Sequence, residues 1–507
     1  MTRLLLMLVL AFALAGCGGG DAAPVSASTS AAGGGGGGSG GTTPPPSGDT
    51  TPPTSPANLS ATTDGPFGAI VSWQASSDNV GVARYRVERC QGAGCSTFTE
   101  VAAPTGTSFT DTGLAATTSY SYRVRATDAA ANLSSFSSVT NVTTAIAPPV
   151  PLPNLPAWVA SLAPGQWFQI PNTAIESVEP SPIPAGTNRD SKVIAWTSFV
   201  VDTRTSKVYS LANGGHNNYA GNEVDMLDLE APVPAWRELI PPTPSAQVTG
   251  CQSYYADGRP TSRHSYYGVT LNEFNDRIML FAGAHWCQGG GFHSAISSYN
   301  ITANTWSPSN THGSVSGVIS AGVAAYALNP LTGDVYAIRG GSFGRWNRAS
   351  GPNGTFTTLN PTGSAPGGEE SASAMDTTRP PGANPIGRIL IVGGNNNDRH
   401  LYTISTNSFT AITLNGANAA SISGADKAGM AYVEAIDRYL VRLDGAGGAV
   451  YEINPSTFEV TAFATTNGAS IPSTQSGPYN KFRYVPRLRG FIYVPSYSGN
   501  AWFLRVH

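Results

Sequence analysis

The feature that most constrains this chain is a strand pattern that recurs six times in its second two-thirds. Each time, a short apolar run follows a tight turn and ends in glycine or other small residues. The runs recur about every 50 to 70 residues, and a strand-only repeat of this length is typical of β-propeller blades. The six runs are 208–215, 278–283, 335–341, 389–394, 439–445 and 491–497. The repeat therefore predicts an all-β fold.

Length and charge exclude some classes of partner. The chain has 507 residues, enough for several domains with their own cores. Its net charge is −3 and only 12% of its residues are charged, so it lacks the basic field that attracts a phosphate backbone. We expect no nucleic-acid partner. The low charge and the abundance of small polar residues fit an extracellular protein.

The first 16 residues are organised as an export signal. Arg3 supplies a positive start, and residues 4–14 form an apolar run too short to span a bilayer. The run ends in Leu-Ala-Gly-Cys, which resembles a bacterial lipobox and implies cleavage before Cys17 and lipid attachment to it. Because Gly18 follows rather than Asp, the resemblance implies an outer-membrane, surface-exposed lipoprotein. An ordinary secretory signal is the alternative.

Four other cysteines support export. Cys90, Cys95, Cys251 and Cys287 are an even number, and in an oxidising compartment such a set predicts two disulfides. We expect Cys90 to pair with Cys95 around a small loop, and Cys251 with Cys287 between two long loops. Free thiols are the alternative.

Composition divides the exported chain into domains. Residues 17–56 are rich in Gly, Pro, Ser and Thr and predict a linker, residues 146–156 predict a Pro-rich joint, and residues 157–507 contain the repeats. Residues 57–145 predict a β-sandwich.

The sandwich segment resembles a fibronectin type III domain. Trp73 lies in an alternating early strand, Leu114 precedes the Tyr-x-Tyr-x-Val pattern that begins at Tyr120, and Val-Thr-Thr closes the segment. The resemblance implies a spacer or adhesive module whose apolar and aromatic positions form its core.

The repeats resemble kelch-type blades, like those of galactose-oxidase-like propellers. The likeness lies in the glycine pair after each second strand and in aromatic residues on the third and fourth strands, as at Tyr402 and Phe409. We expect six blades, with residues 167–170 completing the last blade and removing the free edges that invite pairing between chains. A seventh, irregular blade within 157–190 is the alternative.

Blade geometry predicts which loops share a face. The loops between second and third strands lie on the same side as the connections between blades, and five of the seven histidines fall on this rim. The candidate catalytic residues are His216, Tyr219, Arg263 and His264. The candidate binding residues are Asn222, Glu223, His285, Trp286, His293, Trp346, Arg399, His400 and Arg483.

The residue types on this rim suit several functions. Histidine titrates near neutrality and acts as base or acid, while the glycines of 214–223 allow a tightly turned loop. In the alternative reading, His216 and Asn222 only hold that loop, and Arg263 and His264 only make a contact between blades.

Three classes of function compete. We expect the rim to bind an extracellular polysaccharide or other glycan, since aromatic rings stack on sugars while Asn, Arg and His bind hydroxyls and carboxylates. A polysaccharide lyase acting by β-elimination, with His or Tyr as base and acid and Arg neutralising a uronate, is the second class, although no lyase motif spacing is present. A protein-binding adhesion or scaffold module is the third.

We expect no cofactor. Copper oxidases of the galactose-oxidase family need a Cys crosslinked to a Tyr, and Cys251 has a better partner in Cys287 than in its neighbour Tyr254. Rim histidines are also able to hold a divalent metal, although no two of them show the spacing of a known metal-binding motif. We expect a monomer whose contact with a membrane is made only through the lipid anchor.

Overall fold

The computed structural model describes residues 48–507 apart from short gaps. The gaps are 66–67, 93, 113, 116–117, 146–153, 187, 216–217, 249, 287–290, 320–321, 349, 351–352, 380–386 and 475. The predicted signal, the lipidation site Cys17, His216 and Cys287 therefore lie outside the described residues. Across the part of the chain that the structure describes, no helix is long and apolar enough to cross a membrane.

Residues 57–143 form two antiparallel sheets around one core. One sheet has the order β1 (Ala57–Thr63), β2 (Gly68–Gln74), β5 (Ser108–Thr112), and the other β4 (Thr99–Ala102), β3 (Val82–Gln91), β6 (Ser119–Asp128), β7 (Thr140–Thr143). Alternating residues point inward because side chains in a strand change face at every step. Trp73 and Tyr85 meet edge to face, with ring centroids 5.2 Å apart. The Cys90–Cys95 disulfide is present, as predicted.

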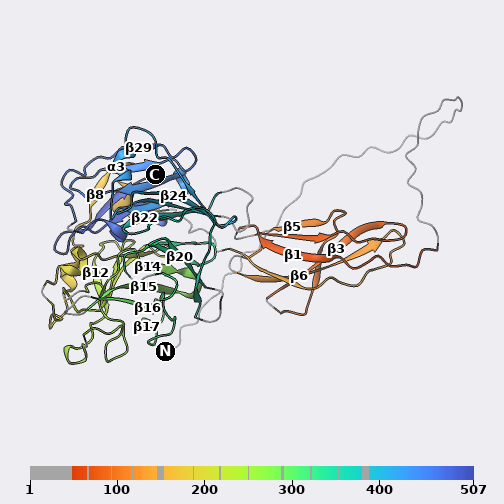
Figure 1. Ribbon diagram of the computed structural model, residues 1–507, viewed down its shortest axis with the longest axis horizontal. Helices are drawn as coiled ribbons and strands as arrows, with labels where there is room; N and C mark the ends of the chain where they lie inside the picture. Colours follow the sequence, from red (N-terminus) through yellow and green to blue (C-terminus); the bar gives the residue numbers. More distant parts are fainter. Residues whose placement is uncertain are drawn as a thin grey trace, which may run out of the picture. The chain divides into compact units, whose positions relative to one another are not determined.

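Residues 167–505 form six antiparallel sheets (Figure 1), and in all but the last of them the strands follow chain order. The first contains β9 (Val200–Asp202), β10 (Lys207–Leu211), β11 (Val224–Asp228) and β12 (Trp236–Ile240). The second contains β13 (Arg263–His264), β14 (Val269–Asn272), β15 (Arg277–His285), β16 (Gly291–Asn300) and β17 (Thr305–Trp306). The third contains β18 (Ala325–Leu328), β19 (Val335–Arg339), β20 (Ser342–Asn347) and β21 (Thr355–Thr358).

The remaining three sheets repeat the same topology. The fourth contains β22 (Ser371–Asp376), β23 (Arg388–Gly393), β24 (Asp398–Thr403) and β25 (Ser408–Ala411). The fifth contains β26 (Gly429–Val433), β27 (Arg438–Arg442), β28 (Val450–Ile453) and β29 (Val460–Phe463). The sixth contains β30 (Phe482–Val485), β31 (Gly490–Tyr493), β32 (Trp502–Arg505) and β8 (Trp167–Gln169). The all-β prediction is confirmed.

The last sheet is completed by a strand from the start of the domain. β8 pairs with β32 in the register Phe168↔Phe503, so the prediction that 167–170 completes the last sheet is confirmed. Around β8, the described residues from 154 to 199 contain only the short helical segments α1 (Ala157–Ala160), η1 (Ile175–Val178) and α2 (Ser191–Ile194). They provide no strands for a seventh sheet.

The six sheets share one central cavity. Its volume is about 210 Å³, and its lining includes residues in or beside β14 of the second sheet and the first strand of each of the other five, taking β9 for the first sheet and β30 for the sixth. These include Thr203, Val269, Leu328, Met375, Tyr432 and Tyr484. Neighbouring first strands lie side by side, as β22 does with β18 and β26, and β30 with β26 and β9. All six sheets therefore contribute to one cavity, whereas the propeller and kelch-type assignments stay predictions.

Candidate functional site

Three basic side chains meet at one end of the second sheet. β13 pairs with β15 in the register Arg263↔His285, and β15 pairs with β16 in the register Gly283↔His293. The imidazole rings of His285 and His293 lie with their centroids 5.4 Å apart. We call Arg263, His285 and His293 the Arg–His cluster.

A bulge in β15 makes room for the cluster. The pairing of β15 with β16 shifts register between Phe281 and Gly283, and Gly283 has φ 114°, a conformation that favours glycine. A Cβ atom at Gly283 would lie 2.5 Å from the carbonyl oxygen of His264 and 3.5 Å from Cδ of Arg263. The missing side chain therefore allows β13 to approach and Arg263 to lie across the bulge.

Arg263 is a fully buried cation with weak partners. Its guanidinium donates to the carbonyls of Thr261 (3.4 Å) and Ala282 (3.2 Å) and to Oγ of Ser297 (3.4 Å), all at or beyond the long end of the usual range. Among the described residues no carboxylate lies within ion-pair distance of it. Burial lowers the pKa of Arg263 to about 10, so the side chain stays charged at neutral pH.

His293 is buried, and within the described ranges its imidazole has no hydrogen-bond partner. It is 6% exposed, and neither of its ring nitrogens has a partner among the described residues. Burial lowers its pKa well below the usual range, and the charges of Arg263 and His285 lower the pKa further. His293 is therefore a neutral imidazole at neutral pH, able to accept a hydrogen bond or a proton.

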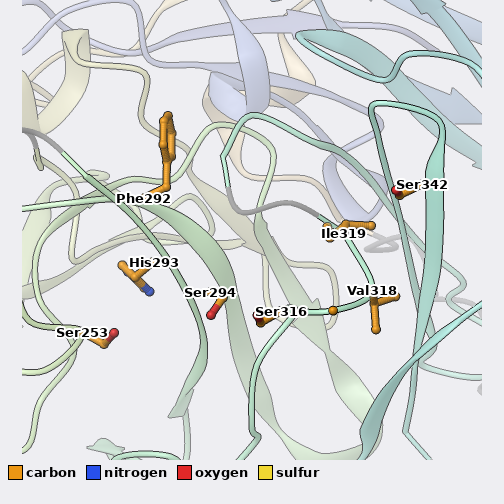
Figure 2. A pocket seen from close by; sticks show the side chains of 9 residues that line it. Ser253, Phe292, His293, Ser294, Ser316, Val318, Ile319 and Ser342 are labelled. Carbon is orange, nitrogen blue, oxygen red and sulfur yellow. The ribbon is translucent and has the colours of Figure 1, made fainter.

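His293 lines a cavity of about 470 Å³ on the same end of the sheet (Figure 2). The other lining residues are Ser253, Phe292, Ser294, Ser316, Gly317, Val318, Ile319 and Ser342. Phe292 is 46% exposed, and in Figure 2 its ring is directed away from the imidazole of His293, as expected for consecutive strand residues. Hydroxyls, an exposed aromatic ring and a neutral imidazole suit a polyhydroxylated ligand, and the volume is that of ordinary ligand pockets.

The loop between β10 and β11 carries four of the predicted residues, of which His216 lies outside the described residues, and Asn222 has a structural role there. Its amide donates to Oγ1 of Thr243 and to the carbonyl of Pro260, both at 2.9 Å, and accepts from the backbone N–H of Thr243 at 2.8 Å. Fully buried, it ties this loop to the segment before β13. The binding role predicted for Asn222 is corrected accordingly.

Tyr219 and Glu223 belong to a second buried group, the Lys192 cluster, with Lys192 and Asp225. The hydroxyl of Tyr219 donates to Glu223 at 2.7 Å, and Nζ of Lys192 lies 2.9 Å from Glu223 and 2.5 Å from Asp225. Burial raises the pKa of Tyr219 far above its usual range, and the neighbouring carboxylates raise it further. Tyr219 and Glu223 are thus held in internal contacts, and the acid–base role of Tyr219 stays a prediction.

His264 and Trp286 lie near the cluster but make other contacts. The ring of His264 lies 5.0 Å from that of Trp196, and its Nε2 accepts from the amide of Asn218 at 3.2 Å. Trp286 packs with Tyr255 and Ala220. Cys251, whose N–H donates to the carbonyl of Trp286, is disulfide-bonded, and its predicted partner Cys287 lies outside the described residues.

Four predicted residues lie elsewhere. Trp346 is 1% exposed and packs against Phe281 in the core between the second and third sheets, so it offers no face to a sugar, which corrects that prediction. Arg399 and His400 lie on β24 of the fourth sheet. Arg483 lines the central cavity and donates to Asn480 at 2.9 Å.

The structure also adds residues that the sequence argument missed. Phe292 could have been found as an apolar residue next to a rim histidine. Ser253, Ser294, Ser316 and Ser342 had no distinguishing pattern, because serine is common throughout this chain. The charge of Arg263 beside both imidazoles disfavours a metal cation at the cluster.

Comparisons with known proteins identify one of the domains. The family model described as "Fibronectin type III domain" matches residues 52–143. Chitinase A1 of Niallia circulans is 39% identical over 144 residues, Exoglucanase B of Cellulomonas fimi 46% over 110, and a gellan lyase of a Bacillus species 45% over 76. These matches cover 26%, 22% and 15% of this chain. The chain spans only 19%, 9% and 3% of those three relatives.

Solved structures give likenesses of the same limited extent. An Fn3-like protein from Clostridium thermocellum is 30% identical, with 18% of this chain and 95% of that chain covered and a TM-score of 0.17. The family match coincides with the two-sheet sandwich that contains Trp73, Tyr85 and Tyr122 in its core. Residues 52–143 of this chain are a fibronectin type III domain.

Proposed function

We propose that the protein binds extracellular carbohydrate through the cavity lined by His293. One observation carries the proposal: four serine hydroxyls, a half-exposed phenylalanine and an imidazole with no hydrogen-bond partner in the described part of the chain converge on a cavity of about 470 Å³. Sugars present many hydroxyls and one apolar face per ring, so they are matched by dispersed polar groups and an aromatic plate.

The relatives support the same class of ligand. Chitinase A1, Exoglucanase B and the gellan lyase bear names of enzymes that act on polysaccharides. A fibronectin type III domain similar to segments of these proteins fits a carbohydrate-binding or carbohydrate-active protein. The alternative of a protein-binding module has no comparable support.

The proposal extends to the whole chain. A lipid on Cys17 anchors the protein to the outer membrane, residues 17–56 form the tether, and the fibronectin type III domain acts as a spacer. Residues 157–507 form a six-bladed, kelch-like propeller that presents the cavity outside the cell. The repeated strand order of the six sheets and their shared central cavity favour this architecture.

A glycan-binding experiment tests the proposal. The full protein is screened on a glycan array, and affinities for the ligands found are measured by titration calorimetry. Phe292→Ala is expected to weaken binding at least about tenfold, because it removes the aromatic plate. Val233→Ala, at another exposed apolar position in the loop between β11 and β12, is the matched control and should change nothing. Absence of any glycan ligand, or normal binding by Phe292→Ala, would refute the proposal.

A second function, polysaccharide elimination, is favoured by the neutral imidazole beside a buried guanidinium. A neutral histidine can take a proton from a sugar carbon, provided that it lies within hydrogen-bond reach. Turnover would produce an unsaturated uronate absorbing at about 235 nm, and His293→Gln would abolish that signal. Binding without new absorbance across a panel of acidic polysaccharides would eliminate this second function.

A further inference from the structure

We propose that the cavity selects an anionic sugar unit, whose carboxylate or sulfate is held by a protonated His293 with Arg263 as the second positive charge. The inference rests on the proposed carbohydrate function and adds the class of ligand. It also predicts that the protein takes up a proton when the ligand binds.

The first step is the unbalanced charge of Arg263. A fully buried guanidinium has three long hydrogen bonds and no carboxylate within ion-pair distance among the described residues. Burial lowers the pKa of Arg263, and Tyr254 and Tyr255 offset this only in part. A buried charge is costly unless it is paired, so an anion at this end of the sheet would stabilise the site.

The second step is the position of His293 between this charge and the cavity. Its ring is more than nine-tenths buried, both ring nitrogens lack partners among the described residues, and it lines the cavity. Figure 2 shows a ring nitrogen on the side that faces Ser294. An unpartnered buried imidazole next to an open cavity is therefore available to a ligand.

The third step is the charge environment of His293. Arg263 on β13 and His285 on β15 both disfavour its protonation in the empty site. At the rim, the Arg339 guanidinium lies 5.7 Å from the Phe292 ring centroid and pairs with Glu369 at 3.2 Å. None of the described lining residues is acidic, so an anion meets no like charge within the cavity.

These steps predict how affinity depends on pH. An anion reverses the local field, so His293 gains a proton as the ligand binds. One proton taken up means that affinity falls by up to tenfold for each unit of rising pH over the range in which His293 titrates. A neutral ligand draws no proton, and its affinity should stay flat.

The test uses ligands that differ only in charge. Oligogalacturonides are compared with their methyl esters, and carrageenan oligosaccharides with their desulfated forms, by calorimetry on the full protein at pH 5.5, 6.5 and 7.5. Titration in two buffers of different ionisation enthalpy counts the protons taken up. At pH 5.5 the charged member of at least one pair should bind tenfold or more tightly than its neutral form, and the two pairs distinguish carboxylate from sulfate.

Variants assign the effect to the cluster. His293→Gln keeps a polar side chain of similar size but cannot be protonated, so the preference for charge and the proton uptake should both disappear. Arg237→Gln, at an exposed position on β12, is the control for a general loss of positive charge and should behave as the parent protein. Circular dichroism of each variant establishes that it is folded.

The outcomes separate this inference from the proposed function. Equal affinity for charged and neutral partners, or unchanged proton uptake in His293→Gln, would overturn the inference. Binding of neutral glycans alone, lost in Phe292→Ala, would leave the proposed function standing without it. Binding of no glycan of either kind would overturn both.

Discussion

Lys192 is a single buried cation shared by two buried carboxylates. Its Nζ lies within ion-pair distance of both Glu223 and Asp225. Burial alone would lower the pKa of Lys192, but the two carboxylates outweigh burial and raise it. Burial raises the pKa of Asp225 from 3.8 to about 7. The cluster therefore joins α2 to β11 through one amine and two acids that compete for it.

Removing the amine should expose this competition. Lys192→Met is expected to lower the free energy of unfolding by about 3–5 kcal/mol at pH 8, because it leaves two carboxylates buried without a cation. The loss should be smaller at pH 5, where Asp225 is protonated. Urea unfolding at both pH values measures it. Lys207→Met, a partly exposed lysine on β10, should cost less than about 0.5 kcal/mol. Equal losses at the two pH values would contradict the assignment.

The sign of the pH effect follows from linkage. Asp225 has a higher pKa in the folded protein than in the unfolded chain, so the folded state binds the extra proton between about pH 4 and pH 7. In this window Asp225 contributes less stability as pH rises. His293 acts in the opposite direction, because its pKa is lowered on folding and the unfolded chain binds the proton below about pH 6.5.

At the scale of elements, the bulge in β15 shapes the candidate site. Ala282 has φ 48° and Gly283 φ 114°, and the shift in register places Gly283 opposite His293. The same bulge brings the carbonyl of Ala282 to the guanidinium of Arg263. The position of the Arg–His cluster is thus a property of the hairpin and not of any one side chain.

Filling the bulge should disturb the site. Gly283→Ala is expected to lower the free energy of unfolding by about 2–3 kcal/mol, since the added Cβ meets the His264 carbonyl and the backbone conformation is strained. Thermal unfolding measures the change, and glycan affinity should fall with it. Gly424→Ala is the control, because an added Cβ there meets no atom within 4 Å. A variant with the stability and affinity of the parent would show that the bulge is not needed.

Residues with left-handed backbone conformation precede the strands that line the central cavity in several of the sheets. Trp196, Tyr266, Glu370, Lys427 and Tyr479 all have positive φ, between 39° and 58°, which is uncommon outside glycine. The N–H of Tyr266 donates to the carbonyl of Trp196, that of Lys427 to Glu370, and that of Tyr479 to Lys427. These left-handed residues therefore link neighbouring sheets through backbone hydrogen bonds. The bonds stabilise the ends of the strands that line the central cavity.

At the scale of the whole molecule, the pairing of β8 with β32 joins the first strand of the six-sheet domain to its last strand. Trp167 is buried, packs beside Phe482 and Tyr493, and donates from Nε1 to the carbonyl of Gly448 at 2.9 Å. Because this pairing joins residues more than 300 positions apart, the six sheets depend on a long-range contact that forms only when the rest is in place.

Weakening the pairing of β8 with β32 should lower the stability of the entire six-sheet domain. Trp167→Ala is expected to cost about 3–5 kcal/mol, the usual cost of removing a buried tryptophan, and to destabilise all six sheets together. Hydrogen exchange measured peptide by peptide checks this. Trp306→Ala, a less buried tryptophan on the outer strand β17, is the comparison. Loss of protection in the sixth sheet alone would contradict a cooperative closure.

The sequence predicted the strands well because their signals are local. Alternation around Trp73 and the turns before residues 278 and 389 are contained in a few neighbouring residues, and the structure has strands at each place. The Cys90–Cys95 pair was equally local. The rim residues were harder, because loop position indicates which end of a sheet a residue lies at but not whether its side chain faces solvent, core or cavity.

By itself, the sequence determined an all-β chain, a fibronectin-like segment and a strand repeat whose last sheet is completed by residues 167–170. The exported N-terminus stays a prediction. Only the tertiary structure decided that Trp346 packs in the core, that Tyr219 bonds to Glu223 and Glu223 to Lys192, and that His293 lines a cavity near the buried Arg263. The physical reason is that burial and hydrogen-bond partners depend on segments distant in the chain, whereas strand and turn formation depend on neighbouring residues.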